Sequence, residues 1–226
     1  MSRPPVVVVL AKAPVPGLAK TRLAASEGPH RAADLAAAAL LDTLETCARV
    51  FAPGRRVVAL TGDLAGAARA QDLGRALASW QVVDQHPGPL GERVRQAVRD
   101  AHRLTGGPVV LLGMDTPQVR AADLEAVAAH AAAGRTVLGP ATDGGWWVLA
   151  VPDPAHADPV APVPTSRPDT GALTLAALRA AGTEPVATAP LRDVDTAADA
   201  RHAADLAPGS RFARAWRAPR PAEAAP

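Results

Sequence analysis

An unbroken run of four valines at residues 6–9 constrains this chain more than any other feature. Continuous β-branched residues are typical of a strand that is buried on both faces of a parallel sheet. A segment rich in proline, residues 13–17, follows directly and leads to Lys20, Thr21 and Arg22. The sequence therefore predicts a buried strand whose carboxyl end opens into a rigid, basic loop.

This basic loop lies where open α/β sheets bind their ligands, at the carboxyl end of a strand. Gly17 lets the backbone turn, and free N–H groups beside the charges of Lys20 and Arg22 suit a phosphate group. A solvated basic turn without a ligand is the alternative. The loop is not a P-loop, because the pattern Gly-x4-Gly-Lys-Ser/Thr is absent.

Length and composition narrow the class of protein. With 226 residues, of which 48% are hydrophobic, the chain can bury one sizeable core, so we expect one domain. The 24 basic and 22 acidic residues give a net charge of +2, which predicts neither a nucleic-acid nor a membrane partner. The apolar run is shorter than the core of a secretion signal, so we expect a cytoplasmic protein. The single cysteine, Cys47, excludes an intramolecular disulfide.

Apolar runs alternate with amphipathic stretches as far as residue 206. This alternation predicts an α/β protein, a three-layer α/β/α domain over residues 1–206 with a mostly parallel sheet. Only a short turn at Asp143-Gly144-Gly145 separates two of the strands, so one of them is expected to be antiparallel. Residues 152–168 predict a long loop that closes over a ligand. Residues 207–226, rich in Pro, Ala and Arg, predict a loosely ordered tail.

Asp115 is the first acidic candidate, because it directly follows the apolar strand expected at residues 108–112. A carboxylate at the carboxyl end of a parallel strand, facing Lys20 and Arg22, is well placed to hold a divalent cation that bridges two phosphates. Oxygen ligands suit Mg²⁺ or Mn²⁺. The alternative is that Asp115 only caps the helix that follows.

Three further groups have both a functional and a structural interpretation. Asp143 can orient an acceptor hydroxyl or act as a base, or it can belong to a plain Asp-Gly turn. Asp193 and Asp195 project to the same side, which makes Asp195 either a second metal ligand or a helix cap. Gly91 and Arg93 at a helix start can grip a base or ribose, or they can be an ordinary helix end. The histidines have no metal-ligand spacing.

The chain resembles the DUF2064 family, which is glycosyltransferase-A-like, over about residues 5–206. The shared motifs occur in the same order and comprise residues 11–23, Leu90-Gly91-Glu92-Arg93, Gly113-Met114-Asp115-Thr116-Pro117, residues 139–145 and Asp193-Val194-Asp195-Thr196. The chain departs from the family pattern at Met114, where the family usually has serine, and at Trp146 and Trp147, where it usually has tyrosines.

The resemblance implies a nucleotide-diphospho-sugar transferase fold, with Asp115 in the place of the metal-binding acid. It also implies that the first loop lies on the nucleotide phosphates, through Ala11, Lys12, Ala13, Gly17, Lys20 and Arg22. We therefore expect an enzyme that uses Mg²⁺ or Mn²⁺, a nucleotide or nucleotide-sugar and a small-molecule acceptor, with Asp143 and Asp115 as catalytic residues. Family analogy favours a bacterial glycosyltransferase. The alternative, favoured by the basic loop, is a nucleotidyltransferase that joins an NTP to a phosphorylated acceptor and releases pyrophosphate. The oligomeric state cannot be predicted.

Overall fold

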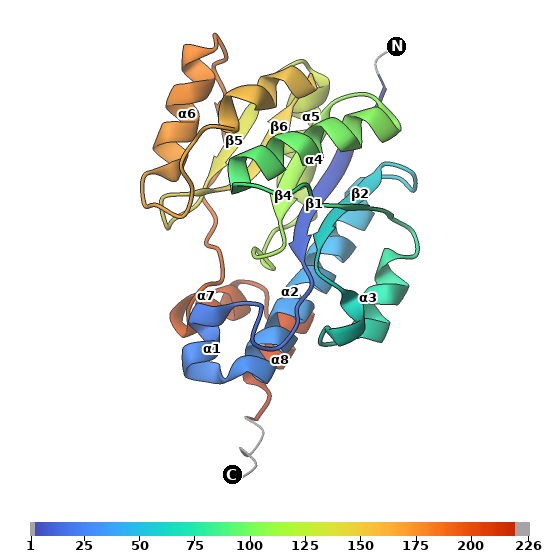
Figure 1. Cartoon of the computed structure of the whole chain (residues 1–226), viewed down its shortest axis with the longest axis vertical. Coiled ribbons are helices and arrows are strands. Elements are labelled where there is room, and N and C mark those ends of the chain that lie inside the picture. The colour runs from blue at the N-terminus through green and yellow to red at the C-terminus, as the bar shows by residue number, and fades with distance from the viewer. Residues whose placement is uncertain (1–2, 220–226) are drawn as a thin grey trace.

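The valine run forms strand β1 (Val6–Lys12) near the middle of a seven-stranded sheet in the computed structural model, which describes residues 3–219 (Figure 1). The strand order is β3-β2-β1-β4-β6-β5-β7. β1 pairs in parallel with β2 (Arg56–Thr61) on one side and with β4 (Val109–Gly113) on the other. All four valine side chains are fully buried. The run is unbroken because helices cover both faces of this strand.

The remaining strands give the sheet its mixed character. β3 (Gln81–Asp84) continues the parallel half. β6 (Trp146–Val151) is antiparallel to both of its neighbours, β4 and β5 (Val137–Pro140). The short β7 (Val186–Ala187) is parallel to β5. The prediction of an antiparallel strand beside the Asp143 turn is thus confirmed.

Helices cover both faces, each with its own core. One face packs against α2 (Pro29–Val50), α3 (Ala70–Leu77), which follows the 3-10 turn η1 (Leu64–Gly66), and α5 (Ala121–Ala132). The other packs against α4 (Leu90–Thr105), η2 (Pro154–Val160) and α6 (Thr170–Ala180). The predicted three-layer fold is confirmed, but part of the expected loop at residues 152–168 is the 3-10 helix η2, which packs on α4. Within residues 3–219, no helix is both long and apolar enough to cross a membrane.

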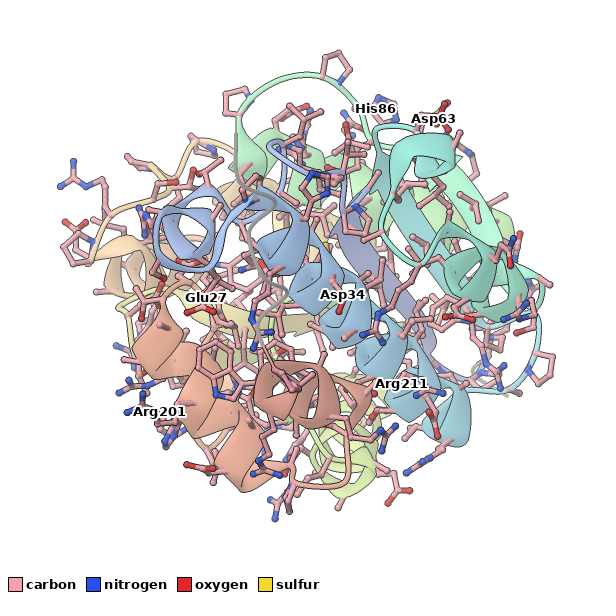
Figure 2. The ribbon with its side chains drawn as sticks, turned by 90° about the horizontal axis from the view of Figure 1, so that it is seen from below. Glu27, Asp34, Asp63, His86, Arg201 and Arg211 are labelled. Carbon is pink, nitrogen blue, oxygen red and sulfur yellow. The ribbon has the colours of Figure 1, made fainter. Side chains whose placement is uncertain are left out.

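A third, smaller core lies beyond the sheet, where α1 (Thr21–Glu27), α7 (Ala197–Leu206) and α8 (Arg211–Arg217) gather around α2 (Figure 1). The prediction of a loosely ordered tail is wrong for residues 211–217. Phe212 is buried in this core, and the Asp42 carboxylate on α2 accepts the backbone N–H groups of Arg211 and Phe212. Figure 2 shows Arg211 where α8 meets α2. Residues 220–226 of the predicted tail lie outside the described residues.

Candidate active site

The carboxyl ends of β1 and β4 open into a cavity of about 940 Å³. The loop after β1, the start of α4, the turn before β6 and the segment before α7 surround it. Most of the predicted site residues line it, namely Ala11, Lys12, Lys20, Arg22, Gly91, Arg93, Asp115, Asp143 and Asp195. Ala13 and Gly17 do not. Ala13 is buried under the loop, where its N–H donates to the Thr61 carbonyl, and Gly17 makes a turn at φ 79°.

The loop after β1 turns the Lys20 side chain back toward the sheet. The N–H groups of Leu18 and Ala19 both donate to the Val15 carbonyl, which closes the loop into a tight turn. Lys20 then adopts a left-handed conformation (φ 50°, ψ 50°) just before α1. This conformation costs a residue other than glycine about 1–3 kcal/mol, so the surrounding contacts must hold Lys20 in place.

Those contacts are two carboxylates. The Lys20 Nζ lies 3.0 Å from Asp115 Oδ2 and 3.1 Å from Asp195 Oδ1. Burial alone would lower the pKa of the Lys20 ammonium, but the charges of Asp115 and Asp195 outweigh this effect and raise it above its ordinary value. Arg22 reaches Asp195 from the solvent side at 3.3 Å, with 73% of its side chain exposed. The two predicted phosphate cations therefore occupy different positions, Lys20 inside the cavity and Arg22 at its rim.

Asp115 is not a helix cap. Helix α5 begins six residues later and is capped by Arg120 and Asp123. The second carboxylate oxygen of Asp115, Oδ1, is enclosed and has no hydrogen-bond partner among the described residues. The nearby backbone N–H of Lys12 donates to the Met114 sulfur at 3.3 Å and not to this oxygen. The structural alternative for Asp115 is therefore wrong, and its side chain faces the cavity.

Asp195 is also free of the capping role. Thr196 and Asp199 cap α7 reciprocally, each side chain accepting the other's backbone N–H. A hydrogen bond of 3.0 Å from the Val194 N–H to the Asp115 carbonyl joins this segment to the end of β4. Because of this bond, two acids 80 residues apart in the sequence face the same ammonium group.

Asp193 lies close to the group that Lys20 forms with Asp115 and Asp195. Burial and the neighbouring Asp115 and Asp143 carboxylates raise the pKa of Asp193 to about 7. One oxygen of Asp193, like one of Asp115, is enclosed without a hydrogen-bond donor. A carboxylate left without a donor in a buried place is costly unless a cation or a proton joins it. The donor set therefore fits a hard divalent cation.

The arrangement is not a complete protein cage for a metal. In the described part of the chain, no three His, Cys, Asp or Glu side chains are gathered so that they could hold an ion. Mg²⁺ is usually held by only one or two carboxylates, together with substrate phosphates and water. Asp115 and Asp195 meet that description, and Lys20 stands between them.

The turn before β6 is shaped by close backbone packing. Asp143 Oδ1 accepts the Gly145 N–H at 2.9 Å. This oxygen therefore stabilises the Asp-Gly turn, as the structural alternative for Asp143 predicted. Gly144 adopts φ 91°, and a Cβ there would lie 1.8 Å from the Pro168 carbonyl oxygen. Only glycine fits at this position. The side chain of Asp143 nevertheless remains exposed to the cavity.

At the opposite end of the cavity, Arg93 belongs to a hydrogen-bonded chain that the sequence did not predict. Arg93 Nε donates to Gln85 Oε1 at 2.7 Å, and Gln85 Nε2 donates to the carbonyls of Ala11 and Ala59 at 2.6 and 2.8 Å. Gln85 directly follows β3. Its position at the carboxyl end of a strand is the sequence feature from which its place in the cavity could have been predicted. Gly91 is needed because a Cβ there would lie 2.6 Å from the Val160 carbonyl oxygen.

The three-layer fold with one antiparallel strand is that of the nucleotide-diphospho-sugar transferases, and cations and acids meet at the carboxyl edge of its sheet. Comparison with models of protein families then identifies the family to which the chain belongs. The model described as "Uncharacterized protein conserved in bacteria (DUF2064)" matches residues 43–167, and this chain belongs to that family.

Similar proteins agree with this class. Phosphoenolpyruvate guanylyltransferase of Streptosporangium roseum is 36% identical over 115 residues, which cover 50% of this chain and 49% of the relative. A Mycobacterium sp. protein of the same name is 35% identical over 122 residues, 54% of each chain. The chain thus matches about half the length of these curated relatives.

Solved structures extend the similarity to nearly the whole chain. A Desulfovibrio desulfuricans protein, provisionally described as a nucleotide-diphospho-sugar transferase, superposes with a TM-score of 0.79 at 25% identity, covering 94% of this chain and 92% of the other. CMP:2-keto-3-deoxy-manno-octonic acid synthetase, solved with CTP, superposes with a TM-score of 0.55 at 14% identity, covering 90% and 98%. The latter similarity concerns the fold alone.

Proposed function

We propose that this chain is a metal-dependent nucleotidyltransferase, which joins a nucleoside triphosphate to a small phosphorylated acceptor and releases pyrophosphate. The observation that carries this proposal is the meeting of two cations, Lys20 and Arg22, with Asp115 and Asp195 at one edge of the sheet. A triphosphate needs both kinds of group: cationic side chains for its terminal phosphates, and carboxylates for the Mg²⁺ or Mn²⁺ that accompanies it.

The first substrates to test are GTP and phosphoenolpyruvate. Both follow from the name of the relatives that share about 35% identity with half of this chain. We place the nucleoside at the end of the cavity formed by Gly91, Arg93 and Gln85, and the acceptor at the opposite end, beside Asp143 and residues 165–167. The phosphates then lie between the two ends, over Lys20.

In the proposed reaction, an oxygen of the acceptor phosphate attacks the α-phosphorus of the triphosphate. The bond from this phosphorus to the oxygen that bridges to the β-phosphate breaks, and pyrophosphate leaves with the electron pair. Lys20 and Arg22 stabilise the charge that develops on the leaving group. Asp115 and Asp195 would hold a divalent cation, which would supply Lewis-acid stabilisation when bound.

This chemistry assigns Asp143 a different role from the predicted one. A phosphate monoester has its second pKa near 6, so at neutral pH the acceptor is already ionised and needs no general base. Asp143 then contributes the turn and negative charge near the cation, rather than proton transfer. Base catalysis by Asp143 belongs to the second candidate function, sugar transfer to a hydroxyl group.

Sugar transfer is favoured by one observation, the description of the Desulfovibrio desulfuricans protein. The two functions differ in the phosphates that the basic loop meets. A sugar transferase never meets a γ-phosphate, so it should bind GDP, its product, at least as well as GTP. A nucleotidyltransferase should bind GTP clearly better.

The test is a pair of titrations with GTP and GDP in the presence of Mg²⁺, followed by a pyrophosphate-release assay with GTP and phosphoenolpyruvate. We expect GTP to bind at least tenfold more tightly than GDP, and pyrophosphate to appear only when the acceptor is present. A hundredfold excess of GTP over its Kd should raise the free energy of unfolding by about 2.7 kcal/mol. Equal or tighter binding of GDP would contradict the proposal and favour sugar transfer.

A further inference from the structure

Lys20 makes unusual contacts for a residue expected to bind phosphate. Its ammonium group lies between Asp115 and Asp195 at about the same distance from each, and only 10% of its side chain is exposed. Its backbone has a left-handed conformation that lysine seldom adopts. The chain thus places a cation between the two carboxylates best suited to hold a metal ion.

The choice of lysine at this position stands out in this sequence. Arginine occurs 22 times and lysine only twice, at residues 12 and 20, and both lysines line the cavity. Arginine presents a planar, rigid fork, whereas lysine carries a compact point charge on a flexible stem. A lysine can therefore fill the space of a small cation and then move away from it, and a guanidinium group is less suited to do so.

The charges make simultaneous occupancy unfavourable. Lys20 contacts one oxygen of Asp115 and one of Asp195, so a divalent cation held between these two carboxylates would lie close to the ammonium group whichever of their oxygens it took. An ammonium group and a metal ion held by the same two carboxylates would lie a few ångströms apart in a partly buried place, where like charges repel strongly. Without any cation, the carboxylates of Asp115, Asp193 and Asp195 would repel one another.

We infer that Lys20 is a displaceable placeholder for the metal ion. Its ammonium holds the Asp115 and Asp195 side chains together while the site has no metal, and it would turn to the phosphates of the bound nucleotide when a divalent cation occupies the two carboxylates. This inference rests on the proposed function, because it needs a metal and a phosphate ligand at one site. It makes the two ligands cooperative: each favours the conformation of Lys20 that the other requires, and the coupling is reciprocal.

The first experiment titrates the protein with Mn²⁺ alone, without nucleotide, and follows free Mn²⁺ by electron paramagnetic resonance. Lys20→Met removes the placeholder, and Lys12→Met removes the same charge from the other cavity lysine, for which the structure gives no side-chain contact with a carboxylate. We expect Lys20→Met to bind Mn²⁺ at least tenfold more tightly than the wild type, and Lys12→Met to stay within threefold.

The outcomes separate this inference from the proposed function. Equal or weaker Mn²⁺ binding by Lys20→Met than by the wild type would overturn the placeholder role alone, leaving Lys20 as a fixed structural cation. If neither the wild type nor the variants bind Mn²⁺ without nucleotide, the placeholder inference fails, and the metal dependence of the proposed function is decided separately by the same titration with GTP present.

A second measurement uses the wild-type protein and so does not depend on whether Lys20→Met folds. Because the chain has only two lysines, acetylation by a water-soluble anhydride can be read at each by mass spectrometry. We expect Mn²⁺ to increase the rate of Lys20 modification at least threefold relative to Lys12, since displacement exposes the amine. An unchanged or lower relative rate would overturn the inference.

Discussion

Asp42 and Asp115 are both acids whose carboxylates face a cation, but the protein satisfies them differently. Both oxygens of Asp42 are used: Oδ1 accepts the Arg211 N–H at 3.1 Å and its guanidinium at 3.3 Å, and Oδ2 accepts the Phe212 N–H at 2.8 Å. In Asp115 one oxygen contacts Lys20 and the other is enclosed without a donor. Asp42 is thus fully paired, whereas Asp115 retains an oxygen that could accept a further partner.

This is the difference expected between a structural carboxylate and one that binds a ligand. A buried acid with complete partners fixes the position of a helix, and removing it leaves the partners unpaired. An acid such as Asp115, whose side chain is partly exposed but which has one enclosed oxygen without a partner, leaves that oxygen for a ligand to satisfy. Substitutions in the first region should therefore change folding stability, and those in the second should change ligand binding.

The largest effect is expected for Asp42→Ala, which leaves two backbone N–H groups and a guanidinium without an acceptor. We expect a loss of about 3 kcal/mol in the free energy of unfolding, measured by urea denaturation. The matched control is Glu45→Ala, because Glu45 also pairs with Arg211 but is 42% exposed, and should cost at most about 1 kcal/mol. Similar losses for both variants would remove the distinction between the two regions.

Asp115→Asn should show the opposite pattern. The asparagine carbonyl can still accept from Lys20, so we expect a change in stability of at most about 1 kcal/mol. Metal-dependent binding of GTP should weaken about thirtyfold, or about 2 kcal/mol, because a neutral amide is a poor ligand for Mg²⁺. Isothermal titration of GTP into the protein, once with Mg²⁺ and once with a chelator, measures the metal-dependent part of the affinity. Urea denaturation measures the change in stability. Unchanged affinity in Mg²⁺ would exclude Asp115 as a metal ligand.

The arginines of the two regions, Arg211 and Arg22, should likewise differ, the first in its effect on stability and the second in its effect on ligand binding. Arg211 pairs with Asp42 on α2 and so links α8 to that helix, whereas the Arg22 side chain is exposed and forms an ion pair with Asp195. Arg22→Ala should therefore leave stability unchanged and weaken GTP binding by about 1.5 kcal/mol, the lower value for hydrogen bonds to charged groups. Guanosine should bind equally to both proteins. A parallel loss for guanosine would indicate that the loop has collapsed instead.

The smallest expected effect is an increase in folding stability. Asp193→Asn removes a negative charge from the acid cluster, and at pH 8 the Asp193 carboxyl, whose pKa is raised to about 7, is ionised. We expect the variant without metal to be about 1 kcal/mol more stable than the wild type at this pH. Thermal unfolding in a chelating buffer measures the difference. A less stable variant would show that Asp193 supports the fold.

Much of the fold could be predicted from local sequence patterns. The valine run gave β1, and the two-glycine turn after Asp143 gave the antiparallel β6, because both signals lie within a few residues. Helix α8 was missed because the average composition of residues 207–226 hides its anchors. Ser210 caps the helix, and Phe212 and Trp216 lie four residues apart on the face that packs against the third core.

The candidate site could be predicted in its residues but not in its contacts. Strand-end positions pointed to Lys20, Asp115 and Asp195, and a loop between strand and helix indicated phosphate binding. The sequence could not reveal that Lys20 would face the two acids, because this depends on the left-handed turn before α1 and on the Val194–Asp115 hydrogen bond. Gln85 was missed for a related reason: its partners are backbone carbonyls, which leave no trace in side-chain patterns.

The backbone link between Val194 and Asp115 also bears on when the site can form during synthesis. Strands β1 to β4 and Asp115 are all present by residue 115, so a growing chain can already place Lys20 beside Asp115. Asp195 emerges only after another 80 residues have been added. Until then Lys20 lacks its second acidic partner, and the cavity lacks the lining that the segment before α7 provides. A ribosome-bound chain therefore carries the parallel part of its sheet well before it can hold a nucleotide with its metal.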